Sequence, residues 1–251
     1  MSHHLPHVHI VCASQPRQCT TYLLKGDGGS VLIDPGSGAF EAEVLDGIRA
    51  AGVEPDAIRH VLLTHYHYDH TLGAGGFRDR GMRLVAHPRT AEVLRQGGRR
   101  VWVEYPDYVI PTEVDVTPAD GEVMTLAGMA VRVLHTPGHT DGCASYLVDT
   151  DEGLTAFTGD LLCCETHDDW YVSHVGWAGD EGFSVEASLA SIEKLLAWAP
   201  DRACSGHGPV EGPAVDWLTR ALELGRAGER TLHTELYPQQ RPLPCMKPRT
   251  R

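Results

Sequence analysis

The chain has 251 residues, with 34 acidic residues against 21 Lys and Arg, so its formal net charge is −13 with neutral histidines. Because proteins that bind phosphate backbones usually carry a basic surface, this charge argues against a nucleic-acid partner. The hydrophobic share of 42% indicates an ordinary globular protein, and no apolar run approaches the roughly 18 residues of a membrane-spanning helix.

The N-terminus and the cysteines bear on the compartment. The first ten residues, MSHHLPHVHI, hold no basic segment followed by an apolar one, so we expect no signal peptide. The seven cysteines form no C-x-x-C pair, so neither a disulfide framework nor a cysteine zinc finger is indicated. We therefore expect reduced thiols, a cytoplasmic location and no membrane partner.

The first half of the chain alternates short strands with amphipathic helices. Gly26-Asp27-Gly28-Gly29, between two β-type runs, predicts a hairpin. Phe40, Val44, Leu45 and Ile48 recur at helical spacing and predict a helix. The remaining expected elements are strands at Val8–Ala13, Thr21–Lys25, Ser30–Asp34, His60–Thr64 and Arg83–Ala86, a polar loop leading into a glycine-rich stretch at Gly73–Gly76, and a helix at Pro88–Gln96.

The second half repeats this order after an irregular region. Residues 99–118 hold three prolines and several aromatic side chains, which is typical of a long loop or lid. Expected elements beyond it are strands at Val123–Leu126, Val131–His135, Ser145–Asp149, Leu154–Thr158 and Arg202–Ser205, and helices from Ser184 to Leu196 and around Leu218. We expect two similar halves with stacked sheets and outer helices, forming one domain over residues 1–236 before a proline-rich tail over 237–251.

The segment from Thr64 to His70 carries the strongest chemical pattern. Alternate residues of an extended chain point the same way, so His65 and His67 can converge on one ion. A turn then lets Asp69 and His70 face a second point nearby. The chain's 15 histidines exceed what packing requires, and imidazole is the commonest metal ligand. We therefore interpret this segment as part of a metal site, because an apolar core would not satisfy its polar atoms.

Three further polar residues each follow a predicted strand and adjoin glycine. They are His139 after Gly138, Asp160 after Gly159, and His207 between Gly206 and Gly208. Glycine beside a ligand permits a tight turn and a close backbone approach. Histidine and aspartate together offer nitrogen and oxygen ligands, a set suited to Zn²⁺ and also to Fe or Mn.

The ordered motif H-x-H-x-D-H, followed by His139, Asp160 and His207 and preceded by Ile33-Asp34-Pro35-Gly36, resembles the metallo-β-lactamase-fold hydrolase superfamily. The resemblance extends from about Thr20 to Pro209. It implies an α+β fold, a four-layer αβ/βα sandwich in which two mixed β-sheets pack face to face with helices outside. The metal site would then lie at one edge between the sheets.

The resemblance also implies roles for the ligands. His65, His67 and His139 would hold the first ion, Asp69, His70 and His207 the second, and Asp160 would bridge the two. Asp34 would orient ligands through hydrogen bonds; a turn-forming aspartate before Pro35 is the alternative interpretation. Two divalent ions about 3.5–4 Å apart, which we expect to be Zn²⁺ with Fe or Mn as alternatives, can share a water and bring its pKa towards neutrality. The bridging hydroxide would attack a carbonyl carbon, with Asp69 as proton carrier.

These motifs specify metal-dependent hydrolysis better than they specify a substrate. The branch that fits best resembles glyoxalase II-like thioesterases and lactonase-like enzymes, so we expect a small-molecule ester, thioester or lactone as substrate. A mononuclear-iron sulfur (persulfide) dioxygenase on the same scaffold is the alternative. A β-lactamase and a catalytically inactive metal-binding module are further alternatives. The oligomeric state is left open.

A second aromatic region follows Asp160. The segment 165–183 would form a substrate wall or simply pack as a loop. Its candidate side chains are His167, Trp170, Tyr171, His174 and Trp177.

Overall fold

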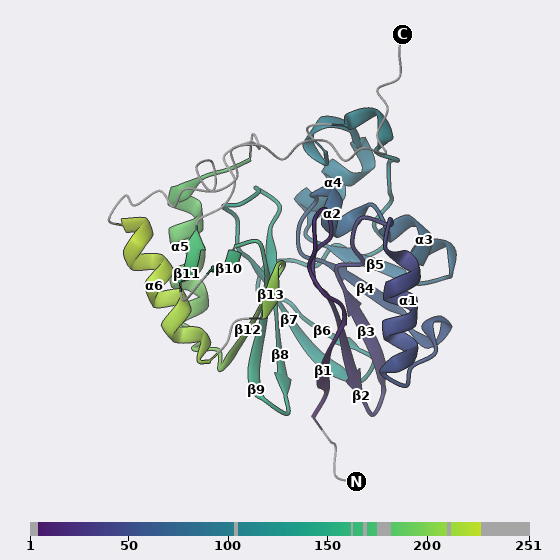
Figure 1. Ribbon diagram of the computed structural model, residues 1–251, viewed down its shortest axis with the longest axis horizontal. Coiled ribbons are helices and arrows are strands. Elements are labelled where there is room, and N and C mark those ends of the chain that lie inside the picture. Colours follow the sequence, from purple (N-terminus) through teal and green to yellow (C-terminus); the bar gives the residue numbers. More distant parts are fainter. Residues whose placement is uncertain are drawn as a thin grey trace.

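A computed structural model describes residues 5–102, 105–161, 163–167, 170–174, 182–209 and 212–226, with backbone alone for residues 163–167, 170–174, 209 and 224. Two β-sheets are stacked, with α1 and α3 on the outside of one and α5 and α6 on the outside of the other (Figure 1). The predicted α+β sandwich of two mixed sheets is confirmed. The predicted tail, 237–251, lies outside the described residues.

The first sheet has the order β1-β2-β3-β4-β5. Its first three strands pair antiparallel and its last three pair parallel, so the sheet is mixed. The predicted hairpin joins β2 to β3, with Gly26 opposite Gly29. The elements of this half are β1 (His7–Cys12), β2 (Thr21–Gly26), β3 (Gly29–Ile33), α1 (Glu41–Ala50), η1 (Pro55–Ala57), β4 (His60–Leu63), α2 (Tyr68–Thr71), α3 (Ala74–Asp79), β5 (Arg83–Ala86), α4 (Pro88–Gln96), η2 (Gly98–Arg100) and η3 (Pro106–Tyr108).

The second sheet has the order β13-β12-β9-β8-β7-β6, in which only β12 and β9 pair parallel. A separate two-stranded sheet joins β10 and β11. The elements of this half are β6 (Val123–Leu126), β7 (Met129–His135), β8 (Ala144–Thr150), β9 (Gly153–Gly159), β10 (Cys163–His167), β11 (Trp170–His174), α5 (Val185–Leu196), β12 (Arg202–Ser205), β13 (Gly208–Pro209) and α6 (Ala214–Arg226).

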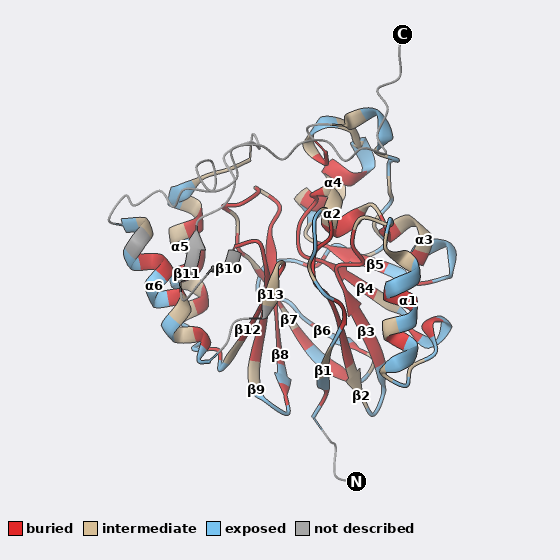
Figure 2. Cartoon of the chain, viewed as in Figure 1, coloured by how far each residue is buried: buried red, intermediate tan, exposed pale blue. Residues whose placement is uncertain are grey.

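Alternation of side chains along the strands divides the core into three layers. Leu23 and Leu32 face the helices outside the first sheet, whereas their neighbours Leu24 and Val31 lie between the two sheets. Successive residues of a strand point to opposite faces, so a strand buried on both faces is apolar throughout. A third cluster packs the outer face of the second sheet against α5 and α6. Figure 2 shows the buried residues concentrated in the strands and the inner faces of the helices.

The structure differs from the sequence prediction in three segments. The polar loop and glycine-rich stretch after β4 contain two short helices, α2 and α3, because glycine lowers helix propensity without forbidding a helix that packs on a core. Phe77 of α3 is fully buried, which shows that packing decides this segment. The segment after Asp160, expected to be a loop, contains the β10–β11 hairpin in the backbone.

Two further expectations concern the thiols and the membrane. Cys12, Cys19, Cys143 and Cys204 are all free and buried. Among the described residues, no helix combines the length and the apolar character that a membrane crossing requires.

Candidate metal centre

The turn between β4 and α2 places two histidines at the edge of the first sheet. The Thr71 hydroxyl lies 3.2 Å from the carbonyl oxygen of Tyr66 and 2.9 Å from that of His67, so it closes the turn. His65 and His70 are completely buried on either side of this turn. The residues of the motif therefore converge because a local hydrogen bond folds the chain back on itself.

The second sheet contributes three more side chains at the same edge. The last residues of β9 and β12 lie opposite each other in parallel pairing, so Asp160 and His207 leave the sheet side by side. The amide of Gly206 donates to the carbonyl of Gly159 at 2.9 Å and fixes that register. His139 follows β7, which runs in the same direction as β9 because both pair antiparallel with β8.

A first group of ligand atoms comes from His65, His67 and His139. One ligand atom from each lies within 4.8 Å of the other two, and all three side chains are buried. Nε2 of His139 is 2.8 Å from Nδ1 of His67, and the two rings are nearly perpendicular at 87°. Three imidazole nitrogens converging in this way match a zinc site with an open position.

A second group lies beside the first and comes from Asp69, His70 and His207. Oδ2 of Asp69 is 3.8 Å from Nε2 of His70 and 3.6 Å from Nε2 of His207. The carboxylate and two imidazoles again point at one location, so the motif supplies ligand atoms to two adjacent points, as the spacing predicts.

Asp160 lies between the two groups. Its Oδ2 is 3.5 Å from Nε2 of His139, in the first group. The same carboxylate contacts the second group, with Oδ1 3.3 Å from Nε2 of His70 and Oδ2 3.3 Å from Nε2 of His207. The structure therefore brings all seven predicted ligand residues together, with Asp160 in the position of a bridge.

Asp34 sets the tautomer of His70. Its carboxylate, which can only accept hydrogen bonds, lies 2.8 Å from Nδ1 of His70, so Nδ1 carries a proton and Nε2 is the nitrogen directed at the other candidate ligands. The carboxylate also accepts from the backbone amide of Thr64 at 2.8 Å and from its hydroxyl at 2.7 Å. Asp34 is placed where the orienting role predicted for it requires.

Two hydroxyl groups do the same for His65 and His207. The Thr64 hydroxyl donates to Asp34 and lies 3.1 Å from Nδ1 of His65, whereas the Ser14 hydroxyl donates to a carbonyl oxygen and lies 2.9 Å from Nδ1 of His207. Each hydroxyl can therefore accept from Nδ1 of its imidazole, which leaves both Nε2 atoms directed at the other candidate ligands. The sequence offers no pattern that identifies Ser14, which lies 193 positions before His207.

The buried nitrogens provide a test of whether these residues fit a metal. Nε2 of His65 and Nε2 of His70 are inaccessible to solvent and make no hydrogen bond. Leaving a buried polar atom unsatisfied costs free energy, so such atoms call for an explanation. A bound cation satisfies both of them, and the donor set of imidazoles and carboxylates therefore fits divalent metal ions.

Charge at the site also favours a cation. Burial alone would raise the pKa of Asp160, but His207 and His70 hold it well below its usual range. Burial alone would lower the pKa of His70 and of His207, but the carboxylates of Asp160 and Asp69 raise both. Burial lowers the pKa of His65 well below its ordinary value, so that imidazole is neutral. The carboxylates thus demand positive charge, which metal ions can supply in place of protons.

Cys19 lies next to the site without belonging to it. Its sulfur lies close enough to Asp34 and His70 for the three to form another potential ligand group. Burial raises the pKa of the Cys19 thiol to about 12, and the thiol lies 3.7 Å from the carbonyl oxygen of Asp34. A protonated thiol that donates to a carbonyl is a poor metal ligand, because thiolate is the binding form.

Gly206 illustrates why glycine accompanies the ligands. A Cβ atom there would lie 2.0 Å from Oδ1 of Asp160 and 2.6 Å from Cε1 of His70. No other residue permits this approach of backbone to ligands, as the sequence pattern predicts.

Access to the site is asymmetric. The side chains of Asp69 and His207, in the second group, are 15% and 27% exposed, whereas all three side chains of the first group are buried. Solvent therefore reaches the second group more easily than the first, beside the loop that carries Ser14.

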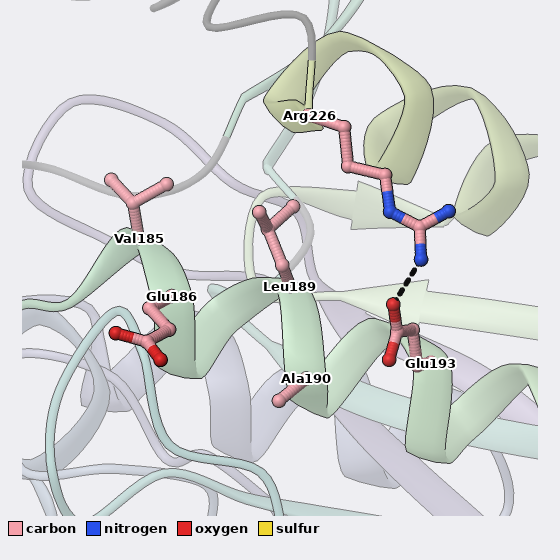
Figure 3. A pocket seen from close by; sticks show the side chains of 6 residues that line it. All are labelled: Val185, Glu186, Leu189, Ala190, Glu193 and Arg226. Carbon is pink, nitrogen blue, oxygen red and sulfur yellow. Dashed lines mark hydrogen bonds and ion pairs between the residues drawn. The ribbon is translucent and has the colours of Figure 1, made fainter.

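The predicted substrate wall falls outside what the structure describes. His167, Trp170, Tyr171 and His174 lie on β10 and β11, whose side chains are not described, and Trp177 lies outside the described residues. The hollow shown in Figure 3 is a different feature. It has a volume of about 520 Å³ and lies between α5 and the end of α6, where Glu193 pairs with Arg226. None of the seven candidate ligands lines it.

The family model of the metallo-beta-lactamase superfamily matches residues 14–207, which include every candidate ligand. The chain belongs to the metallo-beta-lactamase superfamily. Membership implies binding of divalent metal ions, and the histidine-rich cluster is the candidate location. A subclass B3 metallo-beta-lactamase from a soil metagenome library has the same fold, with a TM-score of 0.67, 22% identity, and coverage of 90% of this chain and 94% of the other.

Relatives in the superfamily include enzymes that act on different acyl compounds. An atrochrysone carboxyl ACP thioesterase of Aspergillus fumigatus is 30% identical over 76% of this chain and 50% of its own length. An N-acyl homoserine lactonase of a Bacillus species is 25% identical over 69% of this chain and 73% of its own length. The chain spans 50–58% of the length of several curated relatives that it matches.

Proposed function

We propose that this chain is a metal-dependent hydrolase that cleaves a small-molecule ester, thioester or lactone at a dinuclear site. His65, His67 and His139 would hold one ion and Asp69, His70 and His207 the other, with Asp160 shared between them. The observation that carries the proposal is the position of Asp160, whose carboxylate contacts both ligand groups. Two divalent ions so held would supply Lewis-acid polarisation of a carbonyl and would lower the pKa of a water molecule.

Residues of the chain would exchange protons, orient the imidazoles and exclude water at the site. Asp69 is the more exposed of the two carboxylates at the ligand groups, so it can exchange a proton with a bound water or a leaving group. Asp34, Thr64 and Ser14 hold the imidazoles with Nε2 directed inward. The buried His65 side of the site excludes bulk water, which strengthens electrostatic interactions there.

The substrate class rests on chemistry and on the relatives. A thiolate leaving group, with a pKa of about 8.5, needs little protonation, so a thioester requires no dedicated general acid. A lactone or ester presents the same carbonyl carbon to the site. The names of the thioesterase and lactonase relatives support this choice, and the net charge of −13 favours a small molecule over nucleic acid.

Metal analysis combined with a substrate panel tests the proposal. Protein purified without oxygen is expected to contain two zinc ions per chain and to turn over chromogenic thioesters or lactones faster than β-lactams. One iron per chain with sulfide-dependent oxygen uptake would show a dioxygenase instead. Full metal occupancy without turnover of any ester, thioester or lactone would show a binding module.

Asp160→Ala tests the bridging role directly. We expect this variant to lose at least one ion and to fall at least about 100-fold in turnover, because each ion loses a shared ligand. The exposed Asp149 on β8 provides a control, and Asp149→Ala is expected to keep both ions. Wild-type metal content and turnover in Asp160→Ala would refute the assignment.

A further inference from the structure

A second cluster of charged side chains lies next to the first ligand group. Asp141, two residues after His139, accepts hydrogen bonds on both carboxylate oxygens. Its Oδ1 accepts from the Tyr66 hydroxyl at 3.1 Å and from Nη2 of Arg100 at 3.0 Å, and its Oδ2 accepts from Nε of Arg89 at 2.9 Å. Tyr66 lies in the turn between β4 and α2, Arg100 on η2 and Arg89 on α4, whereas Asp141 lies in the loop after β7. One carboxylate therefore connects four separate segments.

Tyr66 connects this cluster to the metal ligands. It stands between His65 and His67 in the chain, is completely buried, and packs edge-on against the His67 ring with centroids 5.4 Å apart. Its hydroxyl donates to Asp141 and accepts from Arg100 at 2.7 Å. The guanidinium of Arg100 also lies over the Tyr66 ring, 5.1 Å from its centroid. The orientation of the ring beside His67 is therefore fixed from two sides.

The backbone around Asp141 is held equally closely. The Thr90 hydroxyl, on α4, donates to the carbonyl of Gly142 at 2.7 Å. A Cβ atom on Gly142 would lie 2.5 Å from that hydroxyl, so α4 approaches the loop as closely as glycine allows. The carbonyl oxygen of Asp141 accepts a hydrogen bond from Nε2 of His135 at 3.1 Å. The loop that carries His139 is therefore held by hydrogen bonds to the Asp141 side chain and to the backbone carbonyls of Asp141 and Gly142.

The cluster is suited to fixing geometry more than to adding stability or binding a substrate. The side chains of Asp141, Arg89 and Arg100 are 37%, 32% and 21% exposed, and partly exposed ion pairs contribute little to folding free energy. Partial burial would raise the pKa of Asp141, but hydrogen bonds from Arg89 and Arg100 hold it below its usual range. Both guanidinium groups are engaged by carboxylates, since Arg89 also pairs with Glu92 at 2.7 Å.

We propose that Asp141, acting through Tyr66 and Arg100, is a positioning residue that keeps His67 and His139 converged for the first metal ion. The two imidazoles come from segments 72 positions apart and meet at 2.8 Å. Asp141 and Tyr66 are neighbours of these two histidines in the chain, and their mutual hydrogen bond spans the same gap. The inference rests on the proposed metal centre. It adds a residue that affects the first ligand group and not the second.

Zinc affinity measured in two backgrounds tests this asymmetry. His207→Ala weakens the second group and leaves the first to bind an ion, whereas His139→Ala does the reverse. Competition with a chromophoric chelator is measured for each background with and without Asp141→Asn. We expect Asp141→Asn to reduce zinc affinity about 10- to 100-fold in the His207→Ala background, the usual effect of losing a residue that orients ligands. In the His139→Ala background we expect a change of less than about twofold, because the second group does not contact Asp141.

Control variants separate this effect from a general loss of structure. Asp149→Asn makes the same substitution at an exposed position and is expected to leave both affinities unchanged. Tyr66→Phe removes only the hydroxyl, with its hydrogen bonds to Asp141 and from Arg100. It is expected to show the same asymmetry at about 2- to 10-fold, a smaller loss because the direct Arg100–Asp141 hydrogen bond remains. It also serves as the test if Asp141→Asn does not fold.

The possible results distinguish the two proposals. If the wild-type chain binds no zinc, the proposed metal centre fails and this inference fails with it. If the wild-type chain binds two zinc ions but Asp141→Asn and Tyr66→Phe weaken both backgrounds equally, or neither, the metal centre stands and the positioning role is overturned. Loss confined to the His207→Ala background supports it.

Discussion

Asp34 adopts a left-handed backbone conformation, with a φ of +50°, directly after β3. Aspartate and asparagine tolerate this region better than most residues, because their short side chains hydrogen-bond locally. Here the side chain accepts three hydrogen bonds, two from Thr64 and one from His70. The geometry therefore fits the turn-forming and the orienting interpretations together, since the turn places the carboxylate beside Nδ1 of His70.

Asp34→Asn separates these two roles. Asparagine keeps the backbone conformation, but its amide group donates where an oxygen accepted, so at least one of the three buried donors loses its partner. We expect the free energy of unfolding in urea to fall by about 1–3 kcal/mol, and zinc affinity to fall about 10- to 100-fold. Asp46→Asn, on the exposed face of α1, is the control. Unchanged zinc affinity would show that the orientation of His70 does not depend on Asp34.

His87 caps the N-terminus of α4. Its Nδ1 accepts from the amide of Arg89 at 3.3 Å, which caps α4, and its ring stacks on His135 with centroids 3.8 Å apart. Burial and the neighbouring His135 lower the pKa of His87 from 6.5 to about 4. Protonation would remove the capping acceptor, so the folded protein keeps this imidazole neutral.

This pKa predicts a pH dependence of stability. Between pH 6.5 and about 4 the unfolded chain binds a proton at His87 and the folded chain does not, so folding stability falls as pH falls through that window. His87→Asn keeps a capping acceptor that does not titrate. We expect urea unfolding in the presence of chelator to show a smaller loss between pH 6.5 and 4.5 in the variant than in the wild type. Parallel profiles would contradict the assignment.

At the scale of elements, the spacing between α1 and β1 depends on one glycine. Gly47 lies within α1, and a Cβ atom there would be 1.9 Å from the carbonyl oxygen of Val11 on β1. Gly75 lies within α3, and a Cβ atom there would meet nothing within 4 Å. The two glycines have the same intrinsic cost to their helices but opposite packing environments.

Alanine substitutions at these positions should therefore have opposite effects. Gly75→Ala is expected to raise the free energy of unfolding by about 0.5–1 kcal/mol, because alanine loses less conformational entropy in a helix. Gly47→Ala is expected to lower it by about 1–3 kcal/mol, because α1 must move away from β1. Urea denaturation of both variants measures the difference. Equal shifts would show that α1 adjusts its position without cost.

At the scale of the whole molecule, the candidate ligands join the two sheets. His65 and His70 follow β4 of the first sheet, whereas His139, Asp160 and His207 follow strands of the second. Metal ions bound between them would link the two halves of the sandwich at one edge. Because the folded chain alone assembles these ligands, metal binding adds directly to folding stability.

Chelation is therefore expected to destabilise the entire domain. An ion present at 100 times its dissociation constant contributes about 2.7 kcal/mol, and about 1 kcal/mol shifts the midpoint of a chain of this size by roughly 2–4 °C. We expect Tm to fall by at least about 5 °C in chelator and to recover when zinc is restored. A chelator saturated with zinc beforehand provides the control, and an unchanged Tm would argue against ions that bridge the sheets.

Much of the fold and of the site follows from local sequence. The alternation of Leu23 and Leu24, or of Val31 and Leu32, is a property of strands buried on both faces. The seven candidate ligands follow strand ends and adjoin turns or glycines, so their order along the chain predicts their convergence. Where local pattern is weak, as in α3, burial of Phe77 against the core overrides glycine content.

The tertiary structure alone decided which side chains support the ligands. Ser14 contacts His207 across 193 positions, and Tyr66 contacts Asp141 across 75. None of these residues belongs to a periodic pattern, because a hydrogen bond between distant segments depends on how the sheets and loops pack. The sequence by itself determined the ligand types, their order and the two layers of strands. The packing of those layers determined the hydrogen bonds to the imidazoles, the position of Asp160 between the two groups and the charged cluster around Asp141.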